Sequence, residues 1–206
     1  MTIRGNTRGC VMPIMYCRNK FMRLLVSVWL LWTVANQAFA SQSTLWVSSK
    51  EGGIQFEMTD GSVYRLTLPD PVKGVFYDRN KHEVGGGTYV ALFQVLPSNA
   101  VSSTGYCGAG SEVWLYVYKV VTAQLHEHSK VLVGSCLSSI SMLSQNTGVS
   151  TQETDFSSVQ WNERGFSIEW FNHMDAQGRS LSSTRYVLQD GVFLPSHVVG
   201  NVHQAQ

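Results

Sequence analysis

Apolar residues recur at every second position through much of this chain, and this period constrains the fold more than any other feature. Residues 54–58 alternate apolar and polar side chains, and Asp60-Gly61, a frequent hairpin turn, follows directly. The same alternation returns in segments 63–68, 166–170 and 184–188, while segment 89–96 is an apolar run and segment 112–120 is apolar on both faces. Beyond residue 40, no segment has the three- and four-residue apolar spacing of an amphipathic helix. The pattern therefore predicts β-strands joined by short turns.

The number and spacing of these segments predict the architecture. We expect about nine to ten strands, which is typical of an antiparallel barrel or sandwich, and the pattern does not decide between the two. The polar stretch 144–154 is the best internal linker, but it is too short to establish two domains. We therefore expect residues 41–206 to form a single all-β domain, and 166 residues are enough for a real core.

The first 40 residues have the features of an export signal. Arg23 precedes a mostly apolar run at 24–34, and the segment closes on Ala38-Phe39-Ala40, a small-x-small cleavage site. The apolar run is shorter than the ~20 residues that a membrane-spanning helix needs, so we expect cleavage after Ala40 and a periplasmic or secreted protein that meets the membrane only during export. An uncleaved anchor is the alternative. Translation could also begin at Met12, Met15 or Met22, because signal peptides usually start close to the initiator.

Removing this segment changes the net charge. Five of the 15 Lys and Arg lie in residues 1–40 and no acid does, so residues 41–206 carry 10 basic and 14 acidic residues, a net charge of −4. No stripe of Lys or Arg is visible, and a net-acidic domain has no general attraction for phosphate backbones. Nucleic-acid binding is therefore disfavoured.

Two cysteines, Cys107 and Cys136, remain beyond residue 40. In an exported protein such a pair most simply forms a disulfide, and we expect one here. Metal binding would need further ligands at close spacing, and a nucleophilic Cys107 would need a free thiol. We expect Cys107 just ahead of a strand at 112–121 and Cys136 within a strand at 131–143, with the polar segment 124–130 forming the turn between them.

Few residues point to catalysis, a metal or a cofactor. His126 and His128 could share a metal on a strand, but no third ligand is indicated, and in the expected turn they are solvated. The glycines at 85–87 lack the Gly-Lys-Ser/Thr of a phosphate loop and predict a mobile hairpin connection. No hydrolase motif is present. Glu112 and Glu169 are the carboxylates that we single out as possible perturbed acids, although an ordinary exposed carboxylate is the simpler interpretation of each. We expect no catalytic residue, metal or cofactor.

Two segments are candidate binding sites. Segment 78–83 is the most charged part of the domain, and it is either a solvated loop or a protruding loop that reaches into a partner. In segment 112–120 both faces of the strand are apolar, so the strand is either covered on both sides or presents an aromatic binding face. The candidate binding residues are Arg79, Lys81, His82, Glu83, Trp114, Tyr116 and Tyr118.

The functional hypothesis follows from compartment, size and fold class. In these respects the chain is similar to small exported, disulfide-linked β proteins of Gram-negative bacteria, several of which inhibit lysozymes or neutralise toxins, although such a similarity does not assign a function. We expect a periplasmic, non-catalytic binding protein whose partner is another protein, in the form of an inhibitor or immunity protein for an envelope-acting enzyme. The alternatives are a small envelope hydrolase and a structural accessory of a secretion or surface assembly. The sequence identifies neither the partner nor the oligomeric state.

Overall fold

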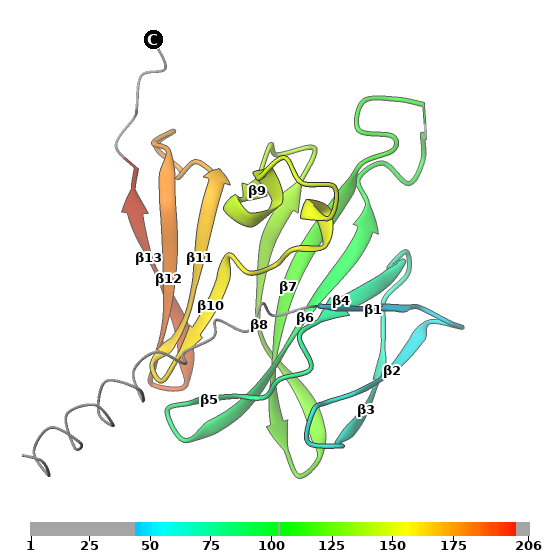
Figure 1. The fold of residues 1–206 in the computed structure, drawn as a ribbon, viewed down its shortest axis with the longest axis vertical. Coiled ribbons are helices and arrows are strands. Elements are labelled where there is room, and N and C mark those ends of the chain that lie inside the picture. The colour runs from blue at the N-terminus through cyan, green and yellow to red at the C-terminus, as the bar shows by residue number, and fades with distance from the viewer. Residues whose placement is uncertain (1–43, 103, 201–206) are drawn as a thin grey trace, which may run out of the picture. The chain divides into compact units, whose positions relative to one another are not determined.

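The computed structural model of the protein describes residues 44–102 and 104–200. These residues form thirteen β-strands and two short 3₁₀ helices, and every strand pairing is antiparallel (Figure 1). The predicted signal peptide and its cleavage site lie outside the described residues and stay predictions. A search of the described part finds no helix with the length and apolar character needed to cross a membrane.

The larger sheet has six strands in the order β1-β4-β6-β7-β8, with β5 also paired to β6. Two of its hairpins close with two-residue turns, Gly85-Gly86 between β5 and β6 and Thr122-Ala123 between β7 and β8. All four turn residues have positive φ, as hairpin turns that match the strand twist require. The strands are β1 (Leu45–Ser48), β4 (Gly74–Tyr77), β5 (His82–Val84), β6 (Gly87–Pro97), β7 (Ser111–Val121) and β8 (Gln124–Ser135).

The smaller sheet has the order β10-β11-β12-β13, with β9 also paired to β11. The two 3₁₀ helices, η1 (Leu143–Asn146) and η2 (Gln152–Thr154), lie in the connection between β9 and β10. The strands are β9 (Ser141–Met142), β10 (Val159–Asn162), β11 (Gly165–Asn172), β12 (Leu181–Gln189) and β13 (Val192–Val199).

A separate hairpin of β2 (Gly53–Glu57) and β3 (Val63–Thr67) forms a third layer (Figure 1). Its turn contains Asp60-Gly61, as the alternation predicted, and the Asp60 carboxylate accepts a hydrogen bond from the backbone N–H of Ser62 at 3.0 Å. This hairpin covers the face of the larger sheet that is turned away from the smaller sheet.

Two apolar cores hold the three layers together. The first fills the space between the two sheets and joins Phe93, Leu115 and Val117 of the larger sheet to Ile168 and Phe166 of the smaller one. The second lies under the β2–β3 hairpin. It is made of residues that are almost completely buried, among them Phe56, Met58, Tyr64, Val75, Val90, Leu92 and Tyr118. Strands β6 and β7 are therefore covered on both faces, which confirms one of the two interpretations of segment 112–120 and explains its apolar residues on both sides.

The sheets do not close into a barrel. Each sheet ends in strands that pair with one neighbour only, and the facing sides of the two sheets pack as an open sandwich. Thirteen strands are present rather than nine or ten, because β1, β5 and β9 are only four, three and two residues long. Such short strands are held by pairing with a neighbour, so their own residues carry little alternation.

The prediction of a turn at 124–130 is wrong. These residues begin β8, and the reversal occurs earlier, at Thr122-Ala123. Strand β8 is an edge strand, so solvent-facing polar residues such as His126 and Glu127 are tolerated along it. Cys136 accordingly follows the end of β8 at Ser135 and is not inside a strand.

Candidate functional site

The antiparallel order collects several long connections at one end of the sandwich. Strands β6, β8 and β11 run toward this end, and β7 and β12 start from it. We call it the loop end, and it comprises the described residues of 98–110 (98–102 and 104–110) together with 136–140, 143–158 and 171–180. Figure 1 shows the connection between β6 and β7 extending beyond the strand ends. The opposite end has the tight turns at 85–86, 122–123 and 190–191.

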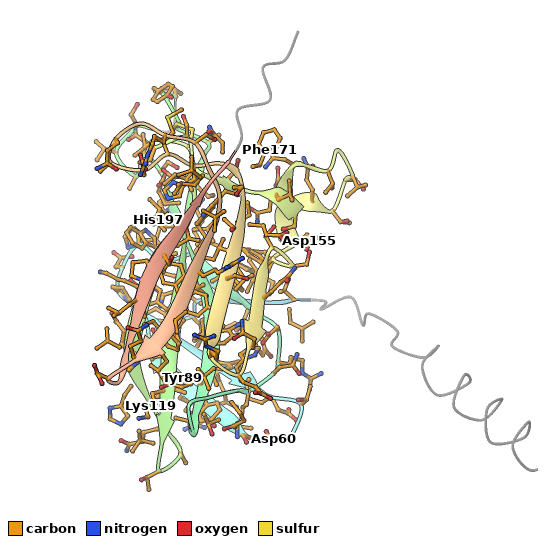
Figure 2. The ribbon with its side chains drawn as sticks, turned by 90° about the vertical axis from the view of Figure 1, so that its left-hand side faces the viewer. Asp60, Tyr89, Lys119, Asp155, Phe171 and His197 are labelled. Carbon is orange, nitrogen blue, oxygen red and sulfur yellow. A yellow bond between two sulfur atoms is a disulfide. The ribbon has the colours of Figure 1, made fainter. Side chains whose placement is uncertain are left out.

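Exposed apolar side chains gather at the loop end. Val101 is 98% exposed and Tyr106 75% exposed, and further large apolar residues there are about half exposed. Figure 2 places Phe171 at this end of the molecule and Tyr89 and Lys119 toward the other. Exposed apolar residues that cluster in one region are typical of an interaction surface. The others at this end are Leu137, Leu143, Val149, Phe171 and Met174.

Residues 98–110 form a compact loop whose two ends meet. The Ser98 N–H donates to the Gly110 carbonyl at 3.0 Å, and inside the loop the Ser102 N–H donates to the Asn99 side-chain oxygen at 2.8 Å. The Gly110 N–H donates to the Cys107 carbonyl at 3.0 Å. Compact loops with closed ends are often functional. The backbone of this loop is thus organised by its own hydrogen bonds.

The disulfide anchors this loop to the end of β8. Cys107 and Cys136 are 29 residues apart in sequence, with a Cα–Cα distance of 5.8 Å, and their predicted pairing is confirmed. A Cβ at Gly110 would lie 2.9 Å from the Cys136 Cβ, so only glycine allows this approach. Tyr106 is therefore adjacent in sequence to the disulfide-bonded Cys107, and its side chain is exposed.

Glu112 fixes the base of the same loop. Its Oε1 accepts a hydrogen bond from the Ser98 hydroxyl at 2.6 Å and one from the Leu137 N–H at 3.4 Å. The carboxylate that we singled out as a possible perturbed acid therefore joins the 98–110 loop to the start of the 136–140 loop. Glu169 lies on β11 of the smaller sheet, opposite Ser183 of β12, whereas Glu112 lies on β7 of the larger sheet.

A cleft of about 450 Å³ opens beside the disulfide, between the two sheets. Its apolar wall includes Phe76, Val113 and Phe156, and the Phe76 and Phe156 rings are 5.2 Å apart. Polar side chains of the η1–η2 region line it as well, namely Gln145, Asn146, Glu153 and Thr154. Ligand sites in proteins have this size and this combination of an apolar wall with a few polar groups.

The loop end has few charges. Segments 98–110 and 136–140 contain none, and the Arg179 guanidinium pairs with the Asp175 carboxylate at 2.7 Å. Glu153 and Asp155 are acidic residues of the η1–η2 region without a basic neighbour in that segment. The surface is thus uncharged or weakly acidic.

The predicted site at Arg79, Lys81, His82 and Glu83 lies near the other end of the larger sheet. His82 pairs with Tyr89 at the start of β6, whereas the 98–110 loop begins where β6 ends. The His82 ring is buried and stacks on Trp161 at 4.2 Å, and its Nε2 lies 3.0 Å from an Asp78 carboxylate oxygen without the alignment of a hydrogen bond. This side chain connects the two sheets.

The other members of this segment also contact the protein. The Lys81 ammonium donates to the Asp60 carboxylate at 2.8 Å, and this bond lowers the pKa of Asp60 and raises the pKa of Lys81. Glu83 accepts a hydrogen bond from the Thr88 hydroxyl at 2.8 Å, and the Arg79 carbonyl accepts the N–H of Thr59 at 2.8 Å. The segment packs against its surroundings and does not protrude, and its role in binding stays a prediction.

The aromatic residues Trp114, Tyr116 and Tyr118 lie on the face of β7 that carries the β2–β3 hairpin. Tyr118 is buried, its hydroxyl accepts a hydrogen bond from the Gln94 amide nitrogen at 3.1 Å, and burial raises its pKa. Tyr116 is partly buried against the same core. Trp114 is also partly buried, and the Lys130 ammonium lies 5.6 Å from its ring centre. Lys81 and the Arg79 backbone therefore contact the β2–β3 turn, Tyr116 and Tyr118 belong to the core under the hairpin, and none of the predicted binding residues lies in the loop-end segments.

The histidine pair and the glycine run have structural roles. A bulge in β8 places His128 beside Tyr89 and Phe193, with ring centres at 5.3 and 5.4 Å, whereas His126 is exposed. The described residues contain no group of three or more His, Cys, Asp and Glu side chains that could hold a metal ion. The 85–87 glycines form a tight turn, and a Cβ on Gly85 would lie 2.8 Å from Leu188, so this connection packs on the smaller sheet.

Sequence reasoning missed the 98–110 loop as a candidate site. One signal was available, because its residues are Ser, Asn, Gly, Thr, Ala and Val with one Tyr and one Cys, and they contain no charge. This composition is close to that of antibody binding loops, where Tyr supplies contact area and Ser, Gly and Asn supply adaptable hydrogen bonds. The exposure of Tyr106 was not visible from the sequence.

Comparisons with known proteins do not assign the chain to a family. No family model matches it, and neither the curated proteins nor the solved structures include a match. The functional inference therefore depends on the geometry of the loop end.

Proposed function

We propose that this chain is an exported, non-catalytic binding protein that engages another protein through its loop end. The observation that carries the proposal is Tyr106, an exposed aromatic residue next to a disulfide-anchored cysteine in a loop closed by its own hydrogen bonds. Aromatic residues dominate the binding energy of many interfaces. A loop that is already ordered loses less conformational freedom on binding.

The form of the loop supports an inhibitor or immunity protein. The 98–110 loop extends from the strand ends and is uncharged (Figure 1), so it can enter a partner's cleft without the cost of burying an unpaired charge. A disulfide is compatible with an oxidising compartment such as the periplasm or the extracellular space. The partner that we propose is an enzyme acting in the cell envelope, and binding of the loop would block its active site.

The proposal is tested with Tyr106→Ala in the full chain, recovered through an affinity tag from envelope extracts of its native cells. We expect a specific co-purifying protein with the unsubstituted chain and at least a tenfold weaker recovery with Tyr106→Ala, since the exposed ring supplies contact area. The matched control is Val192→Ala, an exposed apolar residue at the opposite end, which should leave recovery unchanged. Equal recovery with all three proteins would contradict the proposal.

A structural accessory of a surface assembly is the second candidate, and edge strand β13 favours it. Among the described strands β13 pairs with β12 alone, and Val192, Leu194 and Val199 are about half exposed along it. Exposed apolar edges can accept a strand from another chain. If this candidate holds, Leu194→Lys will abolish co-assembly in size-exclusion chromatography while Tyr106→Ala leaves it intact. The reverse result favours the loop end.

A further inference from the structure

We propose that the cleft beside the disulfide binds a cationic side chain with an apolar stem, in the first place an arginine of the protein partner. This inference rests on the proposed function, because it names the chemistry that the partner presents to the loop end. The cleft adjoins the Cys136 anchor of the 98–110 loop and is lined in part by Gly110 of that loop. A partner that contacts Tyr106 can therefore reach it.

The wall of the cleft fits the stem of such a side chain. Phe76, Val113 and Phe156 contribute apolar surface from three different segments, and the volume of about 450 Å³ exceeds what one side chain occupies. Gly134 of β8 lines this space without a side chain, and a Cβ there would be in ordinary van der Waals contact with Val113, at 3.4 Å from two of its carbon atoms. Long basic side chains bury their methylene groups along apolar surfaces of this kind.

The polar groups of the cleft offer hydrogen-bond acceptors. The Gln145 amide nitrogen donates to the Glu153 carbonyl at 3.2 Å, and the Asn146 amide nitrogen donates to the Met142 carbonyl at 2.9 Å. The oxygen of each amide accepts no hydrogen bond from the described residues. A Cβ on Gly134 would lie 3.9 Å from the Gln145 Oε1, which shows that this oxygen faces β8 across the cleft.

The charge of the lining residues favours a cationic ligand over an anionic one. Glu153 lines the cleft, and no Lys, Arg or His is among its lining residues. An anionic ligand would meet a carboxylate and acceptor oxygens with no basic side chain to pair with. A guanidinium group has five N–H donors and no acceptor, so it matches a cleft whose lining includes two amide side chains with unbonded oxygens and one acidic residue.

The test uses small probes, so it does not depend on finding the partner. The ¹⁵N-labelled protein is titrated with N-acetyl-arginine amide and, as the matched neutral control, N-acetyl-citrulline amide. We expect saturable amide shifts at Ser111, Gly134 and Asn146 with the arginine probe at millimolar concentration, and at least fivefold weaker binding of citrulline. No shift at these residues, or equal binding of the two probes, would overturn the inference.

Two variants localise the binding. Glu153→Gln, at an exposed position, should reduce arginine binding to the citrulline level, and Gly134→Val should abolish it by filling the cleft. Retention of full binding by Glu153→Gln would contradict the inference even if Gly134→Val did not fold. If the arginine probe fails while Tyr106→Ala still loses the partner, only this inference is wrong. If the probe binds but Tyr106→Ala retains the partner, the proposed function is wrong and the cleft remains a cation site.

Discussion

At the scale of the residue, His128 shows how one side chain can make the stability of this fold depend on pH. Its ring packs against Tyr89 and Phe193, and its Nε2 has no hydrogen-bond partner among the described residues. Burial, with a smaller effect from the Lys119 charge, lowers its pKa below the ordinary 6.5. His173 is affected in the same direction by burial and by His197. Both histidines are therefore favoured in the neutral form when the protein is folded.

The lowered pKa values of the two histidines determine in which direction the pH changes the stability of the fold. The unfolded chain binds a proton near pH 6.5, and the folded chain does so only at lower pH, so stability is complete above about pH 6.5 and falls as the pH drops below it. Urea unfolding should show this loss between pH 7.5 and 5, at most about 1.4 kcal/mol per pH unit for each histidine. The lowered pKa values of Asp60 and Asp175 act only at more acidic pH.

Substitution of His128 tests how much of this pH dependence comes from that residue. His128→Gln should flatten the pH dependence of the free energy of unfolding, because glutamine does not titrate in this range. His126→Gln, two residues away and exposed, should leave it unchanged. An unchanged slope in His128→Gln, or a gain in stability on acidification, would show that the cause assigned here is wrong.

At the scale of the element, the strands differ in how far the sequence predicts them. The β2–β3 hairpin and β11 are predicted by their alternation and by a local turn, since both depend on residues near in sequence. The first half of β8 is not predicted, because an exposed edge strand needs no alternation and Thr122-Ala123 is not a recognisable turn. The pairing of β9 with β11 joins distant segments, and no local pattern encodes it.

The Cys107–Cys136 disulfide should contribute a large part of the free energy of unfolding. Replacing both Cys107 and Cys136 with Ser removes the closure of a 29-residue separation. The loss of loop constraint in the unfolded chain should lower the free energy of unfolding by about 3.5 kcal/mol. The hydrogen bond between Ser98 and Gly110 remains in the variant, so the domain should still fold. Urea denaturation measures the change, and a loss below about 1 kcal/mol would contradict this account of the anchor.

At the scale of the whole molecule, the three layers place tight turns at one end and long connections at the other. The all-β class and the disulfide are predicted from the sequence, and the burial of β7 on both faces is one of the two alternatives that the sequence leaves open. The position of the candidate site is not, because it depends on which side chains remain exposed after packing. Lys81 and Glu83 form hydrogen bonds with Asp60 and Thr88, and the buried His82 stacks on Trp161, whereas uncharged residues form the exposed loop.

The central claim is that the loop end contacts another protein, and site-specific photo-crosslinking in intact cells tests it most directly. A photoreactive phenylalanine analogue replaces Tyr106 in one variant and Val192, at the opposite end, in the other. We expect a discrete crosslinked protein adduct from position 106 and none from position 192. Equal adducts from both positions, or an adduct from position 192 alone, would contradict the account.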